Sequence, residues 1–84
     1  MRAVMRRAGE QLQIEDITVT VDAIEDGSVQ MSLRKRESHP VIVTLKTSQF
    51  INGCYNVRIG LIRIQGDRAR IGLEIPPDVK FDRL

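Results

Sequence analysis

Apolar and polar residues alternate along most of this chain. The alternation is regular in five stretches, namely residues 17–22, 29–34, 41–46, 57–62 and 69–75. Successive side chains of a β-strand point to opposite faces of a sheet, so each stretch predicts a strand with one buried face and one exposed face. No window carries apolar residues at the spacing of an amphipathic helix. The pattern therefore predicts an all-β protein.

Turn-forming residues separate the predicted strands. They form four clusters: Glu25-Asp26-Gly27, Asn52-Gly53, Gln65-Gly66-Asp67 and Pro76-Pro77-Asp78. Such clusters favour turns because Gly adopts positive φ, Pro fixes φ, and Asp and Asn bond to the nearby backbone. With this spacing we expect about seven to nine short strands, folded as a small intertwined β-sandwich or barrel.

Two of the predicted hairpins superpose when the sequence is shifted so that Ile17 falls on Val57. Seven apolar residues of the stretch 17–33 then coincide with apolar residues of the stretch 57–73, and the two turns fall together. Any two hairpins of equal length share some alternation, but a gapless match of this length favours an internal duplication. A unit this short cannot bury a core alone. We therefore expect the two halves to pack together, or to interleave with a second chain.

Length and composition limit the chain to a single small domain, residues 1–84. Of its 84 residues 42% are hydrophobic, which is too large a fraction for a disordered chain. No apolar run reaches the roughly 18 residues of a membrane-spanning helix, and the first residues lack the apolar region of a signal peptide. A single cysteine, Cys54, excludes a disulfide within the chain and a cysteine-based zinc cluster. We expect a cytoplasmic protein without membrane contact.

Residues that usually carry catalysis are sparse. The one histidine, His39, precedes a proline in a polar segment, and Cys54 has no recognisable base beside it. There is no phosphate-binding glycine motif. We therefore expect no enzymatic activity, no cofactor and no metal. The net charge of +2, from 13 Lys and Arg against 11 Asp and Glu, is too small to indicate nucleic acid by itself.

Both ends of the chain resemble one known family. The first segment, Arg6-Arg7-Ala8-Gly9-Glu10-Gln11-Leu12-Gln13-Ile14, leads from a double arginine through a Gly-Glu turn into the Thr- and Val-rich stretch 17–21. The last segment joins the strand Arg70-Ile71-Gly72 to the proline step Pro76-Pro77 and then to Val79-Lys80-Phe81-Asp82-Arg83. In both segments the chain resembles a diverged member of the carbon storage regulator (CsrA/RsmA) family.

The resemblance implies an RNA-binding regulator. Members of that family form interlocked β-structured homodimers, recognise GGA in messenger RNA hairpins or leaders, and change translation or transcript lifetime. Their RNA site combines the first strand of one protomer with the last strand of the other. Carried over to this sequence, the RNA-binding residues are Val4, Arg6 and Arg7 in the first strand, and Val79, Phe81 and Arg83 in the last. Messenger RNA or small RNA with GGA motifs is the implied partner.

Between its family-like ends the chain carries an insertion, roughly residues 34–55. We interpret it as part of a partial duplication, with one copy in residues 1–46 and a second in residues 47–84. Val41-Ile42-Val43-Thr44-Leu45 then takes the place of the last strand of the first copy, and Leu45 stands where the functional arginine belongs. One chain would supply a pseudo-dimer with a single intact RNA site; a homodimer is the other possibility. We expect the first and last strands side by side in one sheet, with Arg6 and Arg83 on one solvent face.

Other functions stay open from the sequence. A diverged paralogue of this kind could act through protein–protein contact with a standard CsrA-type regulator. A small barrel that binds single-stranded nucleic acid with little sequence preference is a third possibility. Phe81 fits both packing in the core and stacking on a base, and the low aromatic fraction of 4% argues against a multi-aromatic stacking platform.

Overall fold

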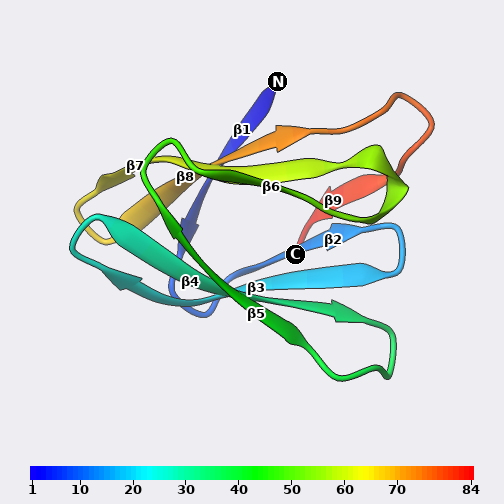
Figure 1. Ribbon diagram of the computed structural model, residues 1–84, viewed down its shortest axis with the longest axis horizontal. Helices are drawn as coiled ribbons and strands as arrows, with labels where there is room; N and C mark the ends of the chain where they lie inside the picture. Colours follow the sequence, from blue (N-terminus) through cyan, green and yellow to red (C-terminus); the bar gives the residue numbers. More distant parts are fainter.

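The computed structural model describes residues 1–84, and its regular secondary structure is almost entirely β-strand (Figure 1). The elements in chain order are β1 (Arg2–Arg7), β2 (Gln11–Ile14), β3 (Ile17–Glu25), β4 (Ser28–Lys35), β5 (Val41–Lys46), β6 (Phe50–Asn52), a single 3-10 turn η1 (Cys54–Asn56), β7 (Arg58–Gln65), β8 (Arg68–Glu74) and β9 (Phe81–Arg83). The predicted all-β class, with up to nine short strands, is confirmed.

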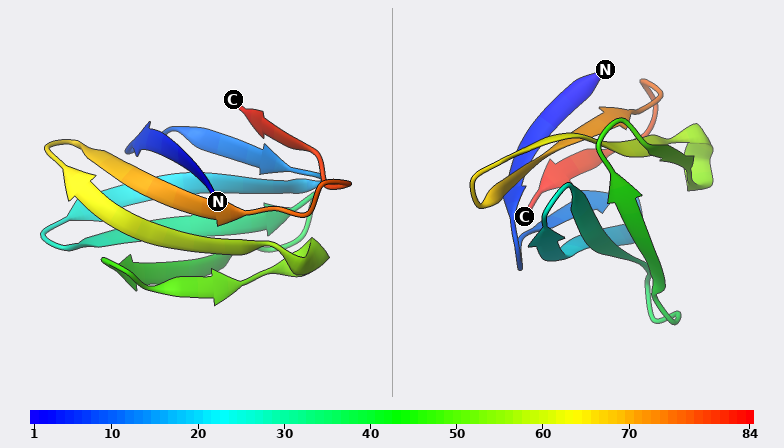
Figure 2. Two further views of the ribbon diagram at one scale, coloured as in Figure 1. Left: turned by 90° about the horizontal axis from the view of Figure 1, so that it is seen from above. Right: turned by 60° about the vertical axis from the view of Figure 1, so that its left-hand side comes forward.

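The strands form two sheets that pack face to face around one core. One sheet has the order β1-β8-β7-β6, the other the order β5-β4-β3-β2-β9, and all neighbours are antiparallel. Figure 2 shows the two layers. Fifteen hydrophobic residues, contributed by both sheets, are buried between them. The alternation of the sequence places these side chains on the inner faces, and their removal from water is the main force holding the sheets together.

The two hairpins that superpose in sequence also superpose in their pairing. Val19 lies opposite Leu33 across β3 and β4, and Ile59 lies opposite Leu73 across β7 and β8. The first hairpin shifts register after Val21, and the second shifts at the equivalent place, after Leu61. Such a bulge inserts one unpaired residue and increases the local twist. Because it recurs at the same position, the duplication extends to the backbone geometry.

The duplication also includes the junctions that precede these hairpins. The Gly9 N–H donates to the Val21 carbonyl, and the Ser48 N–H donates to the Leu61 carbonyl, both at 2.7 Å. Gly9 and Ser48 each adopt a positive φ. In the first junction the N–H of the last β1 residue donates to the Glu10 side chain, and in the second the N–H of the last β5 residue donates to the Gln49 side chain. β5 is therefore the counterpart of β1.

The two first strands are exchanged between the halves. β1 pairs with β8, so that Val4 lies opposite Ile71, and β5 pairs with β4, so that Val43 lies opposite Met31 in the equivalent register. The predicted boundary between residues 46 and 47 is therefore wrong: the repeated units are β1–β4 and β5–β8, and β9 is the additional strand. Alternation alone cannot distinguish a first strand from a last one, whereas the junction hydrogen bonds can.

Phe50 covers two glycines on the outer face of the four-stranded sheet. It lies opposite Gly60, which in turn lies opposite Gly72 on the next strand. A methyl group at Gly60 would lie 2.3 Å from the Phe50 ring, and one at Gly72 would lie 3.0 Å from its tip. The Arg58 guanidinium carbon lies 5.3 Å from the centre of the same ring. An aromatic ring over strand glycines replaces the side-chain packing that glycine lacks.

Replacing Gly60 by Ala is expected to destabilise the fold because the Phe50 ring must leave its place. Overpacking of this kind costs about 1–3 kcal/mol, measured as the free energy of unfolding in urea. Gly53→Ala is the matched control, since its methyl group would meet only the Val57 carbonyl at 3.6 Å. In a Phe50→Ala background the cost of Gly60→Ala should largely disappear. Equal stability of the two single variants would contradict this packing.

Candidate nucleic-acid interface

The first and last strands lie at the same flank of the sandwich but in different sheets. β1 ends the four-stranded sheet by pairing with β8, and β9 ends the five-stranded sheet by pairing with β2. Figure 2 shows both strands at this flank, running in the same general direction. The expectation that they are neighbours in one sheet is wrong, because the exchange of first strands sends β1 to the opposite layer from β2. They are edge strands of the two sheets and lie along the same side of the sandwich, which is called the β1 flank below; the two strands are its rims.

Side chains from both rims point into the space between the sheets. Opposed residues of an antiparallel pair project from the same face. Arg2 is opposite the buried Leu73, and Phe81 is opposite the buried Ile14. The Arg2 guanidinium carbon lies 5.5 Å from the centre of the Phe81 ring, so the two ends of the chain are in contact. A guanidinium over an aromatic face is an attractive cation–π arrangement.

Arg6 is on the same face of β1 and is far less exposed than expected. Its side chain is 12% exposed, and its Nη1 lies 3.7 Å from Glu10 Oε1. Its Nε is buried and has no hydrogen-bond partner. A buried donor without a partner costs free energy. The sequence interpretation of Arg6 as an out-pointing group is therefore wrong. Its side chain is largely buried on the inner face of β1, and its Nε–H donates no hydrogen bond.

Glu10 sets the electrostatics beside the double arginine. The Arg7 N–H donates to Glu10 Oε1 at 2.7 Å, and this bond holds the pKa of Glu10 below its usual value. Desolvation opposes the effect, while the positive charges of Arg6 and Arg7 lower the pKa further. Glu10 is therefore ionised at neutral pH and neutralises part of the positive charge at this end of β1.

The remaining sequence-predicted site residues differ in exposure. Val4 is only 4% exposed and belongs to the core, so its side chain is not accessible to a ligand. Val79 and Phe81 are partly buried and pack against the core, whereas Arg83 is exposed at the end of β9. Arg7 is half-exposed and pairs with Asp67 at 3.2 Å. Arg83 is thus the one of these residues whose guanidinium is exposed and forms no ion pair.

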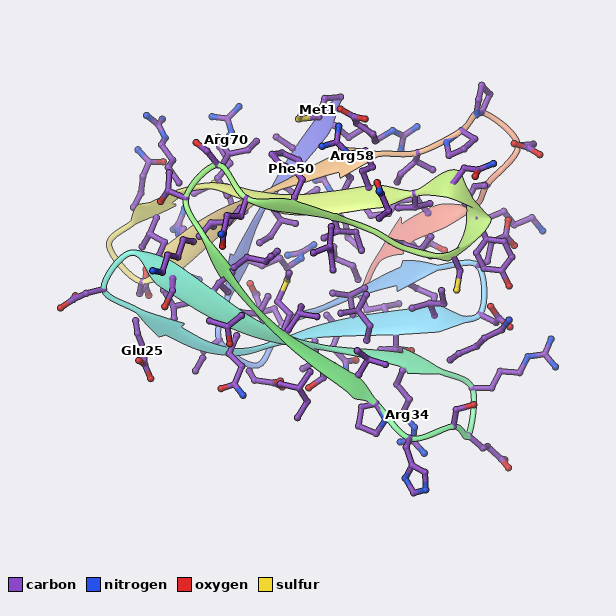
Figure 3. The ribbon with its side chains drawn as sticks, viewed as in Figure 1. Met1, Glu25, Arg34, Phe50, Arg58 and Arg70 are labelled. Carbon is purple, nitrogen blue, oxygen red and sulfur yellow. The ribbon has the colours of Figure 1, made fainter.

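A second set of arginines, which the sequence shows as a basic cluster without an assigned role, lies on the outer face of the same sheet. Arg7 lies opposite Arg68, and Arg63 lies opposite Arg70. Like charges directly opposite one another destabilise a sheet, so these pairs lower the stability of the fold. Figure 3 shows Arg70 and Arg58 on the same side of the molecule as Phe50. The period of two already places Arg68 and Arg70 on one face, but Arg63 joins them only because the register shifts after Leu61.

These groups can attract and orient an anion but offer little for catalysis. Guanidinium groups bind phosphate and guanine edges in bidentate geometry. No group of three or more His, Cys, Asp or Glu side chains is placed to hold a metal ion. No helix of the structure is long and apolar enough to span a membrane.

Comparison of the chain with protein-family models, with curated proteins and with solved structures gives no match.

The duplicated fold provides an internal control for the cost of Arg6. Leu45 of β5 lies opposite Val29 as Arg6 lies opposite Ala69, and Leu45 is 3% exposed. Replacing Arg6 by Leu removes the unpartnered Nε and should raise the free energy of unfolding by about 1 kcal/mol. The reverse change, Leu45→Arg, buries a charge and should lower it by at least about 2 kcal/mol. Urea unfolding of both variants measures this, and a loss of stability in Arg6→Leu would contradict it.

Proposed function

We propose that this protein binds single-stranded, GGA-containing RNA at the flank between β1 and β9 and thereby modulates translation or messenger RNA stability. The observation that carries the proposal is the contact between the two ends of the chain, in which Arg2 of β1 meets Phe81 of β9. Arg6 projects from the same face of β1 as Arg2, and Arg83 from the same face of β9 as Phe81. In the family that these two ends resemble, the RNA site is likewise built from a first strand and a last strand.

The chemistry of the flank fits unpaired bases better than a duplex. RNA proteins read sequence mainly in loops, where exposed base edges can bond to side chains and bases can stack on aromatic or guanidinium planes. Arg83 offers an exposed, unpaired guanidinium, and Phe81 offers a partly exposed ring next to it on the strand. The outer-face pairs Arg7–Arg68 and Arg63–Arg70 would add attraction to phosphates along the neighbouring surface.

The duplicated fold supports one RNA site for each chain. At the opposite flank the position of Arg6 is taken by Leu45 and that of Arg2 by Val41. β6, the counterpart of β2, has no strand in the place that β9 occupies. The cations and the last strand are therefore present together at one flank only.

Gel-shift titration with a GGA hairpin tests the proposal. The unmodified chain should bind the hairpin with salt-sensitive affinity and should not shift a hairpin in which GGA is replaced by CCA. Arg83→Ala should weaken binding by about 1–3 kcal/mol because a guanidinium that reads a base edge contributes this much.

Arg34→Ala is the control for a general loss of positive charge. Arg34 is exposed on the five-stranded sheet, away from β1 (Figure 3). This variant should bind the hairpin almost as the unmodified chain does. Equal losses for Arg83→Ala and Arg34→Ala, or equal binding of the GGA and CCA hairpins, would overturn the proposal of a GGA-specific site at this flank.

A further inference from the structure

The β6 edge is the unfilled counterpart of an edge that the chain fills elsewhere. β9 pairs antiparallel with β2, and the pairing is extended by hydrogen bonds from the Leu84 N–H to the Gln11 carbonyl and from the Glu15 N–H to the Lys80 carbonyl. β6 repeats β2 in its junction and in its pairing with the following strand. However, β6 ends its sheet without a further neighbour. Its outward N–H and C=O groups are therefore free to pair with another strand.

An apolar groove of about 500 Å³ lies beside this free edge. Its apolar wall consists of six residues: Ile17, Leu33, Val41, Val43, Ile51 and Cys54. β9 packs in the equivalent place at the other flank, where Phe81 and Val79 rest against the core. The groove is therefore the space that the side chains of a β9-like strand would fill.

The two flanks differ in chemistry in a way that selects different ligands. At the β1 flank the rim residue over Phe81 is Arg2, whereas its counterpart at the β5 flank is Val41, which is 62% exposed. Leu45 likewise replaces Arg6. The β5 flank thus offers an exposed aliphatic surface in place of guanidinium groups. Such a surface suits apolar side chains, and Lys35 is the one charged residue that lines the groove.

We propose that β6 and this groove form a docking site for an extended segment of a second, different polypeptide. The segment pairs antiparallel with β6, as β9 pairs with β2, and inserts apolar side chains at alternate positions into the groove. Main-chain hydrogen bonds to a free edge supply affinity in this mode, and pockets for alternate side chains supply specificity.

A comparison of the strand pairings gained and lost indicates why the occupant is a different polypeptide. If a second copy donated its own β9, it would expose the β2 edge and the core residues that β9 covers in that copy. One strand edge would gain a partner while another would lose one, so the exchange would add little stability to the pair. A segment that is not already paired in its own protein adds strand pairing and apolar burial without such a loss.

A synthetic peptide with the β9 sequence is the probe, since its side chains fit the equivalent site. The peptide comprises residues Ile75–Leu84 with an amino-terminal fluorophore and is titrated with the full chain by fluorescence anisotropy. Val41→Lys and Ile42→Lys form a matched pair, because these neighbours are 62% and 59% exposed but lie on opposite faces of β5. Of these two residues, only Val41 lines the groove.

We expect the peptide to bind one to one, Val41→Lys to weaken binding at least about tenfold, and Ile42→Lys to change it less than about twofold. A peptide with Ser in place of Phe81 should bind about tenfold more weakly. Amide chemical shifts should change at Ile51 and Asn52 of the full chain.

Several results would overturn the proposal. Absence of peptide binding, or equal effects of the two lysine variants, would exclude the groove as a docking site. Shift changes confined to Gln11–Ile14 would show that the peptide only displaces β9 from β2. Self-association of the unmodified chain that Val41→Lys abolishes would identify a second copy as the occupant. The RNA titrations above do not use this flank, so the two proposals can fail separately.

Discussion

The pairing of each first strand with the opposite half of the chain is the interaction on which the rest of the structure depends. β1 completes the sheet of the second half, and β5 completes the sheet of the first half. Each sheet therefore contains strands from both halves, and the shared core buries residues that a unit this short could not remove from water by itself. The same exchange carries β1 away from β2 and turns its inner face toward the flank that β9 borders. The location of the candidate RNA site is thus a consequence of how the core is assembled.

The duplication creates two related flanks, which differ in the side chains at equivalent positions. Arg2 and Arg6 line one flank, while Val41 and Leu45 occupy the equivalent places at the other. Arg6 carries a structural cost, visible in its buried and unpaired Nε. On the outer face of the same strand, Arg7 adds a like charge opposite Arg68. The aliphatic flank has no such cost but leaves β6 uncovered. A protein under selection for stability alone would have little reason to keep either feature.

Much of the fold could be predicted because period-two alternation encodes strands directly. The strands, the turns around Gly27 and Gly66, and the matching hairpins follow from local pattern. The identity of β5 could not be predicted, since its alternation fits either end of a repeat and only the backbone bonds of Gly9 and Ser48 resolve it. The burial of Arg6 depends on which sheet faces β1, and the opposition of Arg63 and Arg70 depends on the bulge after Leu61. These are relations between strands distant in sequence, which no single stretch contains.

A single RNA site at the β1 flank is the proposal that depends most on this fold. Amide chemical shifts of the labelled protein, recorded during titration with a GGA hairpin, test it most directly. The proposed site predicts saturation at one RNA per chain, with shift changes concentrated in β1, β9 and the neighbouring part of β8. Saturation at two RNA molecules per chain, or changes concentrated in β5 and β6, would contradict it.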